Sequence, residues 1–325
     1  MFAASINSAL GRAGLLLMLA ASVFGALALL YGIRQRDRRL LKQGPIYAWI
    51  AFGGIVLSVV MMQRALITRD FSLAYVQQVG SADTPTLYNI AAMWSALEGS
   101  ILLWALILAG FTAAVAWRFR KRTDDVLVGW ALIVMFVVTA FFAMLSFGPA
   151  DPFAAGAPGI TSGPGPNPLL QNHILVLFHP PILYLGYVGF TVPFAFAIAA
   201  LVTGRLGEGW LMEKRSWALF SWAFLTIGIL LGGWWSYEVL GWSGVWAWDP
   251  VENASLLPWL TGTAYIHSVL VQERRGMLRV WNLSLLVATF ALTILGTFLT
   301  RCGFLSSVHG FGDGPVGNWL LAFFG

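Results

Sequence analysis

The sequence predicts an all-α fold, namely a polytopic bundle of transmembrane helices with the N-terminus outside. Hydrophobic residues make up 58% of the chain and charged residues only 10%, whereas a soluble domain carries about 25% charged residues. Apolar runs of about 20 residues, the length that crosses the hydrocarbon layer, recur along the chain. Basic residues are concentrated in alternate connections between these runs. These observations favour a protein whose helices contact membrane lipid.

Eight apolar runs are long enough for complete spans. They lie near residues 10–31, 45–67, 99–117, 126–147, 179–203, 216–235, 256–272 and 280–300. A ninth begins at Asn318 and Trp319, and the sequence stops at Gly325. We therefore expect residues 1–325 to be the N-terminal part of a transmembrane domain, either a fragment or a subunit that a second polypeptide completes. The first run is too long for a cleaved signal peptide, so we expect it to be a span.

The basic residues predict the orientation of the bundle. Fifteen of the nineteen Lys and Arg residues lie in the first, third, fifth and seventh connections, whereas the opposite connections hold only Arg69 and Arg301. The positive-inside rule places the first set in the cytoplasm and the second outside. The net charge of +5 is therefore a topology signal, and no basic motif indicates nucleic-acid binding. The outer connections are the longer ones, so we expect a functional site there.

Tryptophan is concentrated in one outer connection. Residues 232–259 hold six of the sixteen tryptophans, with glycines between them. The tryptophan stretch, defined as residues 234–255, contains Trp234, Trp235, Trp242, Trp246 and Trp248. Tryptophan gathers at membrane interfaces in general, so an aromatic belt is one interpretation. Indoles in glycine-spaced turns that end at Asp249-Pro250 favour instead an external platform for a flat apolar ligand.

Two histidines bracket the tryptophan stretch on the predicted outer face. His179 precedes Pro180 and Pro181, so we expect it at the outer mouth of the fifth span, with proline at the first helical position. His309 follows the eighth span. The pair predicts two axial ligands for a haem iron, with the ring lying on the indoles. An interfacial histidine without a ligand is the alternative for each residue taken alone.

His267 predicts a second site. It lies 11 residues after Leu256, which is about 17 Å along a helix and so inside the hydrocarbon layer. An ionisable side chain at that depth is costly and indicates a functional role. Its partner ligand would have to come from Met, from solvent or from sequence beyond Gly325. A neutral histidine that bonds a backbone group or a serine is the alternative.

The remaining polar residues have simpler interpretations. We expect His173, in a Gly/Pro-rich loop, to be solvated. Asp249 is expected to cap the seventh span, with Pro250 at its first position, and it could also shape the tryptophan platform by bonding indole N–H groups. Glu98 is a candidate cap for the third span. Cys302 is the only cysteine. No paired carboxylates, nucleophile–base pair or phosphate loop suggests hydrolysis, so no catalytic residue is assigned beyond those that would position a haem.

The run from Trp234 to Asn253 resembles the tryptophan-rich WWD signature of haem-handling proteins of cytochrome c maturation. Three further segments are similar to the CcmF branch of these proteins, the haem lyase subunit. They are Phe178-His179-Pro180-Pro181, Trp94-Ser95-Ala96-Leu97-Glu98-Gly99-Ser100 and Ser307-Val308-His309. The resemblance extends over essentially all 325 residues.

The resemblance implies a protein of the bacterial inner membrane with its site on the periplasmic side. Haem b would arrive from the haem chaperone CcmE and be held with His179 and His309 as axial ligands. It would then be joined through its vinyl groups to the two thiols of a CXXCH motif in apocytochrome c, which CcmH-type partners deliver. A second, b-type haem in the membrane is implied as the electron source. His267 matches one of its ligands, and the other would lie in the family's C-terminal half.

Other interpretations remain open at this point. A haem-delivery protein without ligation activity, like the shorter CcmC relatives, shares the tryptophan motif. The additional spans and the segment from Trp94 to Ser100 favour the lyase. A lyase subclass that serves a variant cysteine motif in nitrite reductase is not distinguished by these residues. In a transporter, His267 would be a proton relay, but broken helices or further midplane charges would be expected.

Overall fold

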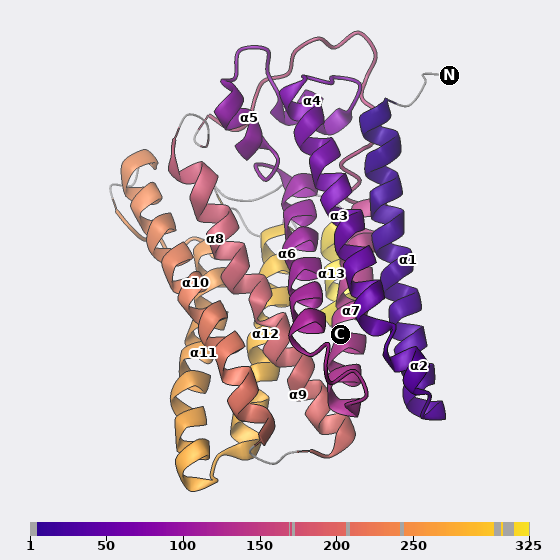
Figure 1. The fold of residues 1–325 in the computed structure, drawn as a ribbon. Coiled ribbons are helices and arrows are strands. Elements are labelled where there is room, and N and C mark those ends of the chain that lie inside the picture. The colour runs from indigo at the N-terminus through magenta and orange to yellow at the C-terminus, as the bar shows by residue number, and fades with distance from the viewer. Residues whose placement is uncertain are drawn as a thin grey trace.

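The computed structural model describes residues 5–168, 170, 173–205, 209–240, 244–301, 307 and 315–324. These residues form helices and connections, with one isolated β-bridge between Leu73 and Ala155. The helices are α1 (Ile6–Gln35), α2 (Arg38–Leu41), α3 (Gly44–Ile67), α4 (Ala74–Val79), α5 (Thr86–Ala92), α6 (Leu97–Arg118), α7 (Val126–Phe147), α8 (Leu175–Gly189), α9 (Thr191–Thr203), α10 (Gly209–Val239), α11 (Pro250–Arg275), α12 (Arg279–Arg301) and α13 (Val316–Phe324). Figure 1 shows a long helical bundle, so the predicted all-α class is confirmed.

Seven segments of the described chain are long and apolar enough to cross a membrane. They are Ile6–Gln35, Arg38–Ile67, Leu97–Arg118, Val126–Phe147, Leu175–Thr203, Arg215–Val239 and Arg279–Arg301. The remaining predicted span, 256–272, lies within α11, a 26-residue helix whose polar side chains include Asn253, His267 and Gln272. The ninth predicted segment corresponds to α13. A total of eight complete spans and an N-terminus outside both stay predictions.

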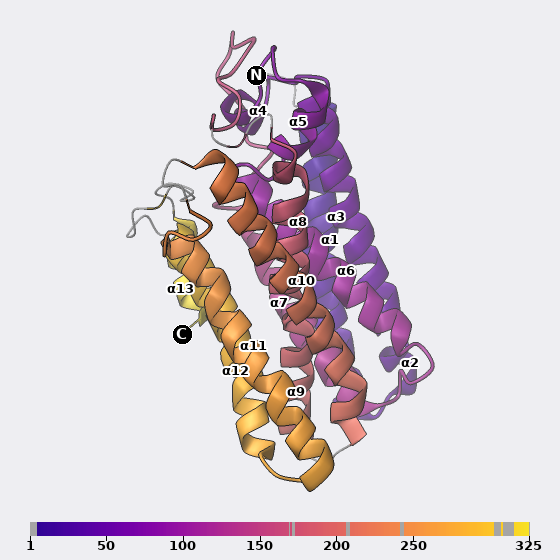
Figure 2. The ribbon, with the colours of Figure 1, turned by 90° about the vertical axis from the view of Figure 1, so that its left-hand side faces the viewer.

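The long helices form two neighbouring groups. In the first, α1 packs on α3 and α7, and α6 packs on the same two helices. In the second, α8 packs on α10, α10 on α11, and α11 on α12. Contacts of α9 with α7 and of α6 with α8 join the groups. Figure 2 shows α11 and α12 side by side along one face, with α13 beside them.

One end of the bundle is covered by α4, α5 and the connection from α7 to α8, as Figure 1 shows. Tyr75 of α4 is 3% exposed beneath this cover. Its hydroxyl donates to the carbonyl oxygens of Ala92 at 3.0 Å and Met93 at 2.8 Å. Burial raises the pKa of Tyr75 above its ordinary value, so the hydroxyl stays a donor. This contact fixes the turn that leads into α6.

The start of α6 differs from expectation. Its N-cap is Ala96, which makes no side-chain capping bond, and Glu98 lies inside the first turn. The predicted capping role of Glu98 is therefore wrong. The next residue must be glycine, because a Cβ at Gly99 would overlap the carbonyl oxygen of Met93. The turn before α6 therefore approaches the helix too closely for a side chain at position 99.

The start of α8 also differs from expectation. The helix begins at Leu175, so His179 lies in its second turn and Pro180 and Pro181 lie inside it. The expectation that proline opens this helix is wrong. The single predicted span at 179–203 divides at Phe190 into α8 and α9. Pro193 lies in the first turn of α9, where a helix needs no backbone N–H donor.

Candidate functional site

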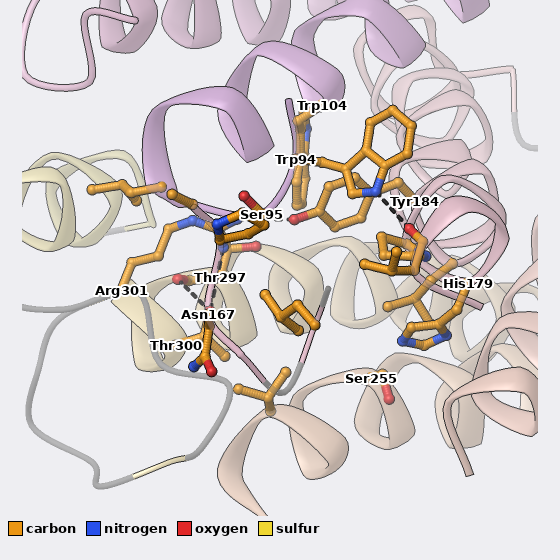
Figure 3. A pocket seen from close by; sticks show the side chains of 18 of the residues that line it. Trp94, Ser95, Trp104, Asn167, His179, Tyr184, Ser255, Thr297, Thr300 and Arg301 are labelled. Carbon is orange, nitrogen blue, oxygen red and sulfur yellow. Dashed lines mark hydrogen bonds between the residues drawn. The ribbon is translucent and has the colours of Figure 1, made fainter. Parts of the chain in front are cut away.

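A cavity of about 450 Å³ lies where the ends of five long helices meet. The starts of α6 and α11, most of α8 and the ends of α10 and α12 contribute to it, together with residues 78–79, 94–96, 165–167 and 170. Its larger side chains are Trp94, Trp104, His179, Tyr184, Tyr187, Trp235 and Arg301, several of which Figure 3 shows pointing toward one another. The volume lies within the range of small-molecule sites.

His179 is held in place by α10. Its Nδ1 lies 2.8 Å from the carbonyl oxygen of Gly228. Because a carbonyl oxygen only accepts, Nδ1 carries the proton and Nε2 carries the lone pair that a metal ligand requires. The ring of Trp235 lies 6.0 Å away, centroid to centroid, at an interplanar angle of 36°. A Cβ at Gly232 would lie 2.6 Å from Cε1 of His179, so a side chain is excluded behind the imidazole.

The prolines of α8 create a second contact at the cavity. Pro180 has no N–H, so the carbonyl of Val176 loses its helical partner. The indole Nε1 of Trp94 donates to that carbonyl at 2.8 Å. Val176 is buried, and a buried carbonyl without a donor would be destabilising. The turn before α6 and the start of α8 are therefore fastened together beside His179.

The tryptophan stretch is divided between a helix and a loop. Trp234 and Trp235 lie in the last turns of α10. Trp235 is 5% exposed and lines the cavity, whereas Trp234 is 56% exposed and donates to Glu238. Trp246 and Trp248 precede α11 and meet edge to face, with centroids 6.0 Å apart. Trp234, Trp246 and Trp248 are not among the residues that line the cavity. Trp242 lies outside the described residues.

Asp249 caps the N-terminus of α11, as expected. Its Oδ1 accepts from the backbone N–H of Val251 at 2.9 Å, and Glu252 completes a capping box. The hydroxyl of Ser307 donates to the same Oδ1 at 2.8 Å. This bond places Ser307, two residues before His309 in the sequence, at the start of α11. His309 and Cys302 themselves lie outside the described residues.

His267 faces outward from the described bundle. Its side chain is exposed, and its Nδ1 lies 2.8 Å from the carbonyl oxygen of Thr263 in the same helix. Among the described residues, no group of three or more His, Cys, Asp or Glu side chains could hold a metal ion. A second site at His267 stays a prediction.

His173 is not simply solvated, contrary to expectation. Its Nε2 lies 2.7 Å from Oε2 of Glu238, and its side chain is only 20% exposed. The contact joins the connection before α8 to the end of α10. It also holds the carboxylate that accepts from the indole of Trp234.

Two cavity residues were not recognised from the sequence as part of a site. Arg301, used there only as a topology marker, is 3% exposed and lines the cavity. Trp104 is 1% exposed and stacks on Phe142. Its indole N–H has no hydrogen-bond partner among the described residues. The available signal was an arginine at the predicted outer end of an apolar helix, where a charge is costly.

Comparison with known proteins supports the resemblance to the CcmF branch. "Cytochrome c-type biogenesis protein CcmF" of Pseudomonas aeruginosa is 44% identical over 97% of this chain and 48% of its own length. The CcmF protein of Escherichia coli is 43% identical over 90% of this chain and 45% of its own length. "Cytochrome c-type biogenesis protein NrfE" of Haemophilus influenzae is 38% identical over 95% of this chain and 49% of its own length.

A solved structure named "Cytochrome c Heme Lyase CcmF" is also similar. It is 40% identical in sequence, has a TM-score of 0.85, and matches 100% of this chain and 50% of its own. The chain thus spans about half the length of the relatives it matches. With seven segments of span length, it is a multi-pass membrane protein. A family model described as "Cytochrome C assembly protein" matches residues 94–305, and the chain therefore belongs to the cytochrome c assembly protein family.

Proposed function

We propose that the cavity binds haem, with His179 as an axial ligand of the iron, and that the chain takes part in joining this haem to apocytochrome c. The observation that carries the proposal is the placement of His179. Its Nδ1 lies 2.8 Å from the Gly228 carbonyl oxygen, a contact that places the proton on Nδ1 and the lone pair on Nε2, as in a metal-ligating histidine. A carbonyl acceptor on the opposite nitrogen also increases the basicity of a ligating histidine.

The remaining walls of the cavity fit a flat, largely apolar ligand. Trp94, Trp104 and Trp235 provide indole surface, and Arg301 provides a positive charge. No Asp or Glu is among the described lining residues. In this proposal the protein orients the ring, excludes water and sets the state of the iron. The addition of thiols to the vinyl groups is chemistry of the haem itself.

The finer parts of the proposal follow from family membership and topology. The substrate is haem b, received from a CcmE-type chaperone on the periplasmic side of the bacterial inner membrane. His309 is the second axial ligand, and CcmH-type partners present the apocytochrome. Support for His309 comes from Ser307, two residues earlier, which bonds Asp249 at the start of α11. Support for the outer location comes from the distribution of Lys and Arg.

A second haem within the membrane is the proposed electron source. His267 is its ligand from this chain, and the opposite ligand comes from beyond the described residues. This proposal is supported by the outward direction of the His267 side chain. A polar ring that faces lipid alone would be costly at that depth. The bond of Nδ1 to the Thr263 carbonyl oxygen at 2.8 Å directs the lone pair of Nε2 away from the helix backbone.

The test uses cytochrome c accumulation in cells that depend on this chain. We expect His179→Ala or His309→Ala to abolish haem attachment while the protein remains in the membrane, as immunoblotting of membranes would show. His173→Ala is the matched control, because His173 bonds Glu238 and is not a cavity residue. Normal accumulation of cytochrome c with His179→Ala would refute the proposed role of that residue.

A further inference from the structure

Among the described residues that line the cavity, Arg301 is the one arginine, and it is almost fully buried. It is the last residue of α12 and is 3% exposed. A guanidinium group stays protonated in proteins, so its charge cannot be removed by burial. Burial of a charge is costly unless it is paired or well hydrogen-bonded. The chain therefore places a permanent positive charge in the wall of the cavity.

Two nitrogens of the Arg301 guanidinium donate to hydroxyl groups of neighbouring side chains. Nη2 lies 3.0 Å from Oγ of Ser100 and 3.0 Å from Oη of Tyr184. Nη1 lies 3.3 Å from Oγ1 of Thr300. These bonds fix the plane of the guanidinium. Tyr184 and Thr300 line the cavity with it.

The indole N–H of Trp104 is a further hydrogen-bond donor in the cavity wall. Trp104 is 1% exposed, lines the same cavity, and has an indole N–H with no partner among the described residues. Its ring lies 5.7 Å from that of Tyr184, centroid to centroid. Figure 3 shows Arg301 on one side of the cavity and His179 on the other, with Trp104 and Tyr184 between them in this view. The cavity therefore has an imidazole on one side and a positively charged guanidinium on the other.

We propose that Arg301 binds a carboxylate of the ligand in this cavity. For the haem of the proposed function, on which this inference rests, the carboxylate is a propionate. The planar fork of the guanidinium matches a carboxylate, and charge-assisted bonds of this kind are the strong ones. With the iron on His179 and a propionate on Arg301, the ring has one orientation in its plane. That orientation decides which edge of the ring, and so which vinyl groups, face the cavity mouth.

The experiment compares iron protoporphyrin IX with its dimethyl ester, in which both propionates are neutral. Each is titrated into the detergent-solubilised protein, and binding is followed by the Soret absorption. We expect the wild-type protein to bind the ester about tenfold more weakly or worse, as expected for loss of a charge-assisted bond. Arg301→Gln should weaken binding of the diacid by a similar factor and leave binding of the ester unchanged, so that discrimination is lost.

Two further variants keep the test decisive. Arg69→Gln removes the other arginine of the predicted outer connections, which is exposed, and should leave discrimination intact. If Arg301→Gln does not accumulate, Arg301→Lys keeps the charge without the planar fork and should show reduced discrimination. Equal affinity of the wild type for diacid and ester, or full discrimination in Arg301→Gln, would overturn the inference alone. Failure of the wild type to bind either porphyrin would overturn the proposed function as well.

Discussion

Replacing Gly232 with alanine tests whether α10 positions the imidazole of His179. An alanine Cβ would lie 2.6 Å from Cε1 and 3.3 Å from each ring nitrogen, whereas ordinary contact is 3.4–4 Å. To relieve this overlap the ring must move by roughly 1 Å, which stretches the Nδ1 bond to Gly228 beyond good hydrogen-bond geometry. Overpacking of this kind costs about 1–3 kcal/mol. If this cost destabilises only the haem-bound arrangement of His179, the affinity for haem decreases by about 5- to 150-fold.

The assay is a haem titration of the purified protein, followed by the Soret absorption, for wild type, Gly232→Ala and Gly53→Ala. Gly53 is the matched control, because it lies in α3 and a Cβ there has nothing within 4 Å. Alanine is favoured over glycine inside a helix by about 0.5–1 kcal/mol, so both variants should fold. Wild-type affinity and an unchanged spectrum for Gly232→Ala would refute the inferred positioning of His179.

Two predictions concern stability in detergent. Trp94→Phe removes the donor to the Val176 carbonyl, whose helical donor a proline has already eliminated, and should lower the free energy of unfolding by about 1–3 kcal/mol. Trp49→Phe is the control, because the side chain of Trp49 is half-exposed. Equal melting temperatures for the two variants would contradict the stabilising role of the Trp94 bond. Partial burial raises the pKa of Asp125, but the bond from Arg122 and further bonds outweigh it and hold the pKa below 3.8. The resulting stabilisation is present above pH 3.8 and is lost as the pH falls through the lower folded value. Asp125→Asn keeps a side chain that can cap the helix but removes the charge. The melting temperature of wild type should therefore approach that of the variant as the pH is lowered. A difference between the two that grows on acidification would contradict the lowered pKa of Asp125.

The long helices could be predicted because each is one continuous apolar run. The predicted span 126–147 coincides with α7. Predictions failed where distant residues decide local structure. Pro180 can lie inside α8 because Trp94, 82 residues before Val176, bonds the Val176 carbonyl that proline leaves without a donor. The hydropathy of the sequence also fails to predict the first turns of α11, because these turns are polar. The capping box at Asp249 stabilises them.

The site was predictable in its chemistry and less so in its geometry. His179 was selected from the sequence, and the structure brings it together with Trp235 at the cavity. Arg301 and Trp104 were not selected, because their convergence depends on how α12 and α6 pack against α8. The residue pattern within one helix gives no information about contacts between residues that lie almost 200 positions apart in the sequence. The direction of His267, outward from the bundle, likewise depends on the packing of α11.

The central claim, that His179 binds haem iron in the cavity, is tested most directly by absorption spectra of the detergent-purified chain in its oxidised and reduced forms. Spectra of wild type would be compared with those of His179→Ala, His309→Ala and the double variant. We expect the spectrum of a haem with two histidine ligands in wild type, altered in either single variant and absent in the double variant. A haem spectrum that is unchanged in His179→Ala would contradict the account.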